Sequence, residues 1–293
     1  MRLPYRLADV FAEVPLAGNR LCVVLDAHGL DTQLMQSIAR EINFSETSFV
    51  TTAASDRYSL RIFTPGKEMP FAGHPTVGTA YVLVSEGLVR SPAVQEVAAG
   101  EFRVEADPET GQAGVWQQAP LYGPELDDRE RLAAAVGLGV DDLHPELPAQ
   151  VVSTGLPHLI VPAVDADAVG RALPDQRILS DVATGVATDG LYLFALADGG
   201  AKARFFGWGI GIDEDPATGS AAGPLGAYLA ARGLGGLPGR IVVRQGEEVG
   251  RPSSLHVEVT PDGDTWTVWV GGGVFVVGRG EFDLPDVPDL SGA

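Results

Sequence analysis

The sequence predicts an α+β protein made of two copies of one unit, and three observations carry this prediction. Short segments rich in β-branched and aromatic residues recur between Gly, Pro and Asp residues, a pattern typical of strands. A few longer apolar segments have the spacing and end signals of helices. Two long stretches of the chain also match each other, which indicates an internal repeat. The length of 293 residues agrees with this, because it suffices for two domains of about 150 residues each.

The strand prediction rests on apolar runs bounded by turn residues. These runs cover residues 21–25, 48–52, 58–64, 158–163, 191–196 and 273–280. A first helix is expected over residues 31–43, because Leu34, Ile38 and Ile42 recur four residues apart behind a cap at Asp31.

Two further helices are expected at 75–87 and 221–233, where the sequence is almost wholly apolar and therefore typical of buried helices. Proline is favoured in the first turn of a helix and disrupts later turns. We therefore expect the second of these helices to begin close to Ser220, shortly before Pro224.

The internal repeat is clearest around these two helices. "RIFTPGKEMPFAGHPTVGTAY" begins at Arg61 and "RFFGWGIGIDEDPATGSAAGPLGAY" begins at Arg204, and each reads as a strand, an irregular Gly/Pro segment and an apolar helix. The offset is 143 at the arginines and 146 between Gly73 and Gly219. Two copies of one unit explain this match.

The domain boundary is expected in the polar, Pro-bearing stretch 117–128. We predict a first domain over 1–118, completed by a C-terminal strand at 280–293, and a second domain over 119–279.

Composition narrows the possible functions. The formal net charge is −19, and the sequence has no basic patch, which disfavours nucleic acid as a partner. A single cysteine, Cys22, excludes an intramolecular disulfide and a cysteine-rich zinc site. No signal-peptide pattern and no apolar run long enough to cross a membrane is present, so we expect a cytoplasmic protein without a membrane partner.

The turns before the two apolar helices are candidate binding sites. The first amides of a helix lack intrahelical acceptors, so two such turns facing one cleft would hold a carboxylate. His74 precedes Pro75 and is expected at the helix cap, and Asp215 is its counterpart in the second copy. Each residue also has a purely structural interpretation. His74 would then be a buried structural histidine, and Asp215 would start an Asp-Pro turn. The second turn lacks the lysine and spacing of a phosphate-binding loop, which disfavours nucleotide binding.

Glu46 is the candidate for proton transfer. It lies in "NFSETSFV", where Phe44 and Phe49 would partly desolvate it and suit it to acid/base chemistry. The alternative is a solvated surface glutamate. The short hydroxyl residues around it, Ser45 among them, favour a cleft.

Six ordered motifs resemble the PhzF-like family of phenazine biosynthesis, relatives of diaminopimelate epimerase, over nearly the full length. They are "DVFAEVPLAGN", "FSETSFV", "RIFTPGKEMPFAGHPTVGTA", "STGLPHLIVP", "DEDPATGSAAGPL" and "QGEEVGRPSSLHVEV". The resemblance implies two pseudo-symmetric diaminopimelate epimerase-like domains, each a barrel-like, mostly antiparallel sheet around a central helix, with the active site in the cleft between them. It also implies a homodimer and chemistry without a cofactor or a metal.

The resemblance also implies roles for residues at the matching positions. Glu46 would be the proton shuttle, and His74 and Asp215 would hold polar groups of the substrate and assist the transfer. The remaining positions would bind the substrate, chiefly its carboxylate, through Ser45, Ser220 and the backbone of Gly73 and Gly219. Asp213 and Glu214 are expected to be solvated or structural charges.

Departures from the family bear on the reaction. Epimerase relatives use two cysteines, one at each helix mouth, whereas Cys22 falls in an apolar strand pattern, so two-cysteine epimerisation is excluded. Arg20 stands where the family usually has proline, and 205–211 is unusually rich in aromatic residues and glycine. Both bear on the choice of substrate.

The leading hypothesis is an isomerase that moves a proton or double bond in a small carboxylate, a cyclic amino or hydroxy acid, by acid/base catalysis with Glu46. A well-known member of the family isomerises trans-2,3-dihydro-3-hydroxyanthranilate in this way. The alternative is a non-catalytic protein that binds small anions and retains the cleft.

Overall fold

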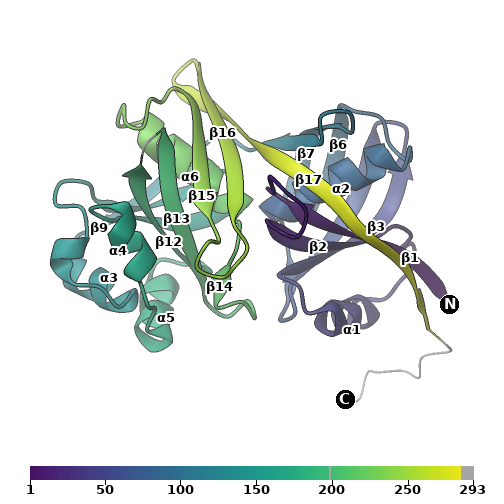
Figure 1. The fold of residues 1–293 in the computed structure, drawn as a ribbon, viewed down its shortest axis with the longest axis horizontal. Helices are drawn as coiled ribbons and strands as arrows, with labels where there is room; N and C mark the ends of the chain where they lie inside the picture. Colours follow the sequence, from purple (N-terminus) through teal and green to yellow (C-terminus); the bar gives the residue numbers. More distant parts are fainter. Residues whose placement is uncertain (198, 285–293) are drawn as a thin grey trace. The chain divides into compact units, whose positions relative to one another are not determined.

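The computed structural model describes residues 1–197 and 199–284, and the chain forms two units. Unit 1 holds Met1–Val115 and the chain from Gly271 on, and unit 2 is Trp116–Val270 (Figure 1). The sequence predicts the return to the first domain at residue 280, whereas it occurs at Gly271. The reason is that β17 (Thr265–Asp283) is one unbroken strand that begins in unit 2 and ends in unit 1. Of the expected final segment, residues 285–293 lie outside the described residues.

Unit 1 contains a mixed sheet and two helices. Its helices are α1 (Thr32–Ile42) and α2 (Gly73–Ser85). Its strands, in chain order, are β1 (Arg2–Val10), β2 (Asn19–Val24), β3 (Glu46–Ala54), β4 (Arg57–Phe63), β5 (Glu68–Met69), β6 (Ala93–Val97), β7 (Gly100–Asp107) and β8 (Gln112–Trp116), followed by the second part of β17.

The sheet of unit 1 closes into a barrel. Its order is β17, β1, β2, β3, β4, β6, β7 and β8, and β8 pairs again with β17. The pairs β2–β3 and β4–β6 are parallel, because a helix connects the two strands in each case. At the closure, the Val274 amide donates to the Gly111 carbonyl at 2.8 Å.

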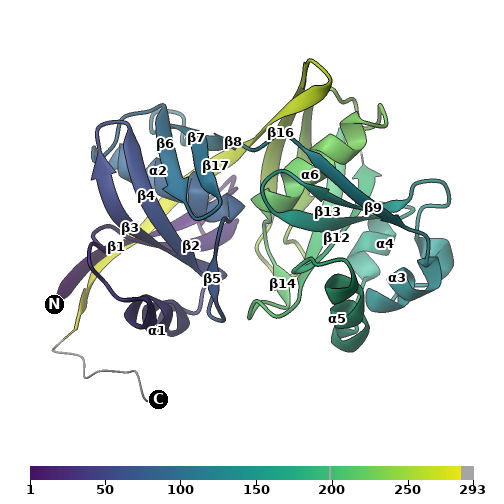
Figure 2. The same cartoon turned by 180° about the vertical axis from the view of Figure 1, so that it is seen from behind.

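Helix α2 fills this barrel, and strands enclose it in the views of both Figures 1 and 2. The helix is apolar on all sides, which is typical of a buried helix, and its first eight residues are all buried. A Cβ at Gly78 would lie 2.6 Å from side-chain carbons of Leu21 and Val10. Glycine at this position therefore lets the helix approach β1 and β2 closely.

Helix α1 confirms the predicted amphipathic helix. The Asp31 side chain accepts the Leu34 amide at 2.8 Å, which caps the first turn. Leu34 and Ile38 of the predicted stripe are buried, and the helix packs against β3 and β4. The left-handed Asn43, with φ of 52°, follows its last turn.

Unit 2 has more helices than unit 1. They are α3 (Arg129–Ala135), the short 3-10 helix η1 (Val140–Asp142), α4 (Ala166–Arg171), α5 (Gln176–Gly185) and α6 (Gly219–Ala230). Its strands are β9 (Leu121–Leu126), β10 (Ala149–Ser153), β11 (Pro157–Pro162), β12 (Gly190–Ala197), β13 (Gly200–Gly207), β14 (Glu214–Asp215), β15 (Gly239–Gln245), β16 (Ser253–Asp262) and the first part of β17.

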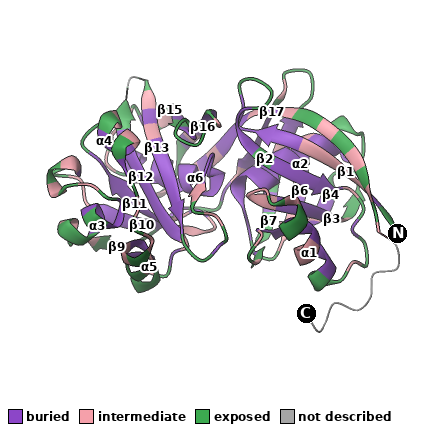
Figure 3. Cartoon of the chain, turned by 60° about the horizontal axis from the view of Figure 1, so that its bottom comes forward, coloured by how far each residue is buried: buried purple, intermediate pink, exposed green. Residues whose placement is uncertain are grey.

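The predicted repeat is present in the topology. In unit 2, β10 to β16 follow the order of β1 to β7, with the same parallel and antiparallel pairs and with α6 in the place of α2. Every residue of α6 is buried (Figure 3). Each of the six runs expected to form strands overlaps one, and these are β2, β3, β4, β11, β12 and β17.

An arginine–glutamate pair marks the same place in both copies. The Arg61 guanidinium lies 2.6 Å from the Glu68 carboxylate, and that of Arg204 lies 2.7 Å from Glu214. Each pair ties the long central strand to the two-residue strand that leads toward the buried helix. Glu214 is therefore a structural charge.

One prediction about the helix starts is wrong, and the other is confirmed except for the place of its proline. His74 is the second residue of α2, and Ala72 occupies the cap with an extended φ of −150°. Backbone N–H groups in the first turn of a helix have no intrahelical acceptor, so a proline, which lacks this group, is tolerated at any position of that turn. Pro75 therefore does not have to be the first helical residue. Helix α6 begins at Gly219, next to Ser220 as expected, but Pro224 lies beyond its first turn. It therefore cannot donate to the Ser220 carbonyl, four residues earlier.

Candidate active site

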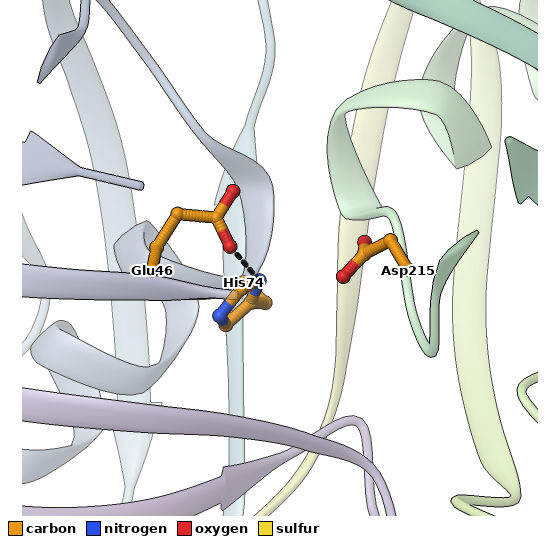
Figure 4. Close-up of side chains that lie close together, drawn as sticks. All are labelled: Glu46, His74 and Asp215. Carbon is orange, nitrogen blue, oxygen red and sulfur yellow. Dashed lines mark ion pairs between the residues drawn. The ribbon is translucent and has the colours of Figure 1, made fainter. Parts of the chain in front are cut away.

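Unit 1 places Glu46 and His74 together at the start of α2. Glu46 is the first residue of β3, and the parallel register sets it beside Leu21 of β2. Its carboxylate Oε2 lies 3.5 Å from His74 Nδ1, and the side chains of Glu46 and His74 are 12% and 2% exposed. Figure 4 shows the Glu46 carboxylate turned toward the His74 ring. The structure thus brings together two residues that the sequence singled out separately.

His74 is a neutral imidazole at physiological pH. Burial lowers its pKa to about 3, and a backbone hydrogen bond with Arg20 opposes this shift. The Asn19 side-chain amide lies 3.0 Å from Nδ1, and the tautomer of the ring decides which of the two groups donates. Within the described residues, buried Nε2 has no hydrogen-bond partner. Nε2 is thus open to a hydrogen bond with a bound molecule.

In unit 2, Asp215 is the last residue of β14 and lies shortly before α6. Figure 4 shows its side chain. Asp215 is buried, and its Oδ2 accepts from Thr218 Oγ1 at 2.7 Å. The Gln245 amide donates to the Asp215 carbonyl at 2.7 Å and accepts from Tyr192 at 2.9 Å. Burial, with the Asp215 charge adding to it, raises the pKa of Tyr192. This buried network fixes the turn that carries Asp215.

The first turn of α6 holds Gly219 and Ser220. Ser220 is buried, and its Oγ lies 3.1 Å from Nε2 of His158, on β11. The Gly219 carbonyl accepts from the Gln117 side chain at 2.9 Å, and Gln117 in turn accepts from the Thr154 hydroxyl. The backbone around Gly219 is therefore held from outside the helix.

The two helix starts share an electrostatic property. The N–H groups of Gly73 and His74 in α2, and of Gly219 and Ser220 in α6, precede the first intrahelical bonds, and each helix adds the positive end of its dipole. Such a terminus favours an anion. Each unit thus supplies a place suited to a carboxylate.

The other residues singled out from the sequence have clear positions. Ser45 is half-buried directly before β3. Arg20 is exposed on β2, with its guanidinium 4.9 Å from the centroid of the Phe44 ring. Phe205 is buried beside His158, whereas Trp208 is 39% exposed.

Cys22 is buried in β2, and burial raises its pKa to about 12. It therefore remains a neutral thiol, which agrees with the exclusion of two-cysteine epimerisation. Carboxylates and imidazole, the groups of Glu46, His74 and Asp215, are also ligand types for divalent metals.

Sequence reasoning missed the residues that hold the site in place, namely Asn19, Gln117, Thr154, His158, Thr218 and Gln245. A usable signal existed for His158, because it is the one polar residue in the strand segment "PHLIVP". A buried polar side chain needs a partner, which points to a network.

None of the helices in the described residues is both long and apolar enough to cross a bilayer.

Comparisons with known proteins agree with the resemblance. The PhzC-PhzF family model, described as phenazine biosynthesis-like protein, matches residues 8–279. The trans-2,3-dihydro-3-hydroxyanthranilate isomerase of Pseudomonas fluorescens is 36% identical over 288 residues, which cover 96% of this chain and 99% of that protein.

Solved structures give the same result. A phenazine biosynthesis protein of the PhzF family from Bacillus anthracis has a TM-score of 0.85 and 30% identity, covering 97% of this chain and 100% of its own. A probable proline racemase from Agrobacterium radiobacter, at 13% identity and a TM-score of 0.66, covers 99% of this chain and 95% of its own and shares the fold alone.

Proposed function

This chain belongs to the phenazine biosynthesis-like PhzF family of isomerases, and from that premise we propose that it moves one proton, and with it a double bond, within a small cyclic carboxylate. The observation that carries the proposal is the Glu46–His74 pair. A nearly buried carboxylate lies 3.5 Å from a neutral imidazole at the start of a buried helix. A carboxylate shielded from water is suited to exchange a proton with carbon.

The proposed reaction needs only one acid/base group. Glu46 takes a proton from a carbon, and the C–H electron pair becomes part of a new double bond while the neighbouring double bond shifts. Protonated Glu46 then returns the proton to the carbon at the far end of the shifted system. The product is an isomer, so no oxidant or reductant enters the balance.

We assign the other residues to binding and assistance. His74 donates through Nε2–H to a substrate oxygen, which stabilises charge that develops there during the transfer. Asp215 holds a polar group of the substrate. The carboxylate is bound by the Ser220 hydroxyl and by the amides of Gly73 and Gly219, whose helix termini favour anions. Ser45, beside Glu46, is a further substrate contact.

The first substrate to test is trans-2,3-dihydro-3-hydroxyanthranilate, the compound named for the Pseudomonas fluorescens relative. It is a cyclic amino and hydroxy acid, the class proposed for this chain. Other cyclic amino or hydroxy acids follow if it does not react.

Proton exchange in D2O tests the proposal directly. Wild type should incorporate deuterium at carbon in the product, followed by NMR, while Glu46→Gln should lose about 100-fold to 10,000-fold in rate, the usual contribution of a general acid/base. Glu41→Gln, an exposed glutamate on α1, is the matched control and should keep the full rate. Full turnover by Glu46→Gln would overturn the assignment.

The same experiment tests the alternative of a non-catalytic anion-binding protein. Tight binding of the carboxylate without exchange or conversion would favour that alternative. A double variant, Glu46→Gln with Asp215→Asn, tests whether both residues act on one bound molecule, since non-additive losses indicate coupling. The homodimer stays a prediction that the molecular mass in solution would test.

A further inference from the structure

His158 is a buried polar residue to which the proposed reaction gives no part. It is the second residue of β11, with a ring 2% exposed and packed edge-on against Phe205 at 5.5 Å between centroids. Its Nε2 lies 3.1 Å from Ser220 Oγ. Its Nδ1 is buried and has no hydrogen-bond partner among the described residues.

The environment keeps this ring neutral. Burial lowers the pKa of His158 to about 3, so at neutral pH only one ring nitrogen carries a proton. A proton on Nδ1 would be a buried donor without an acceptor, and such orphaned N–H groups are rare in proteins. A proton on Nε2 has Ser220 Oγ as its acceptor.

We propose that His158 is a positioning residue for Ser220: its Nε2–H donates to Oγ, which leaves the Ser220 hydroxyl hydrogen to donate to a carboxylate oxygen of the substrate. The opposite tautomer would accept the hydroxyl hydrogen and turn Ser220 away from its proposed task. This inference rests on the proposed role of Ser220 in carboxylate binding.

The tautomer can be measured without turnover. Nitrogen-15 NMR of the full-length protein at pH 7 distinguishes a protonated from an unprotonated ring nitrogen. The chain has five histidines, so the His158 signals are assigned by their loss in His158→Gln. We expect the proton on Nε2. A proton on Nδ1 would overturn the inference and leave the isomerase proposal untouched.

A matched pair of variants tests the positioning role. The amide nitrogen of glutamine lies as many bonds from Cα as His Nε2, and that of asparagine as many as Nδ1. Only His158→Gln should therefore still donate to Ser220. Binding of 2-aminobenzoate, a stable cyclic amino carboxylate, is measured by calorimetry, with the exposed His256→Gln as control.

We expect Ser220→Ala and His158→Asn each to weaken binding about tenfold, the usual effect of losing a hydrogen bond to a charged group. His158→Gln should bind nearly as well as wild type. His158→Asn combined with Ser220→Ala should bind no more weakly than Ser220→Ala alone, because both changes remove one interaction. Additive losses, or equal losses in the glutamine and asparagine variants, would refute the positioning role. Failure of the proposed isomerase would instead appear as missing exchange with binding intact.

Discussion

Lowering the pH should destabilise the fold through its two buried histidines. Burial lowers the pKa of His74 and of His158 from 6.5 to about 3. Between these values the unfolded chain binds protons that the folded chain does not, so the free energy of unfolding falls as the pH falls below 6.5. Each pH unit corresponds to about 1.4 kcal/mol per histidine, which gives a loss of about 2 kcal/mol each at pH 5.

His158→Gln isolates one of these contributions. Urea unfolding, followed by tryptophan fluorescence at pH 7 and pH 5, gives the loss of stability for wild type and variant. The loss should be smaller in the variant by about 2 kcal/mol, whatever its stability at pH 7, because the other titrating groups are common to both proteins. His256→Gln should behave like wild type. Equal losses in wild type and His158→Gln would refute the reasoning.

Three further predictions follow from the fold and site. Thr218→Val should lower stability by about 1.5–3 kcal/mol in urea unfolding, because it removes the hydroxyl that donates to the buried Asp215 carboxylate; the exposed Thr184→Val is its control. Gly78→Ala should cost about 1–3 kcal/mol by thermal unfolding, since its Cβ would lie 2.6 Å from a side-chain carbon of Val10. Dialysis against a chelator should leave turnover unchanged; loss restored by one added divalent metal would contradict metal-free chemistry.

Periodicity and repetition made much of the fold predictable. Alternation between apolar runs and turn residues located the strands, and the stripe of Leu34 and Ile38 located α1, because burial of one face dictates both patterns. The repeat at Gly73 and Gly219 located the two buried helices. The return of the chain at Gly271 was missed, because the three glycines at 271–273 read as a break in the chain, whereas β17 continues through them from one unit into the other.

The site was predictable only in part. Glu46, His74 and Asp215 stand in distinctive motifs, whereas their partners come from distant strands. Gln245 meets the turn of Asp215 only after the sheet has formed, and one polar residue at the end of a strand does not reveal its partner. Local sequence therefore indicates candidate residues for the proposed chemistry, whereas the hydrogen-bond network that holds them depends on tertiary structure.

The course of β17 has a consequence for synthesis on the ribosome. Unit 2 is contiguous, so all of its residues are available once Val270 has emerged, whereas the barrel of unit 1 lacks its last strand until β17 is complete. Until then β1 and β8 present unpaired edges, which are sites for wrong pairing with other chains. The first unit translated is thus the last to close. The Met1 carbonyl already accepts the Leu284 amide, so a circular permutant can start at Gly271 and join residue 284 to Met1. It would make the part of β17 that closes unit 1 available first.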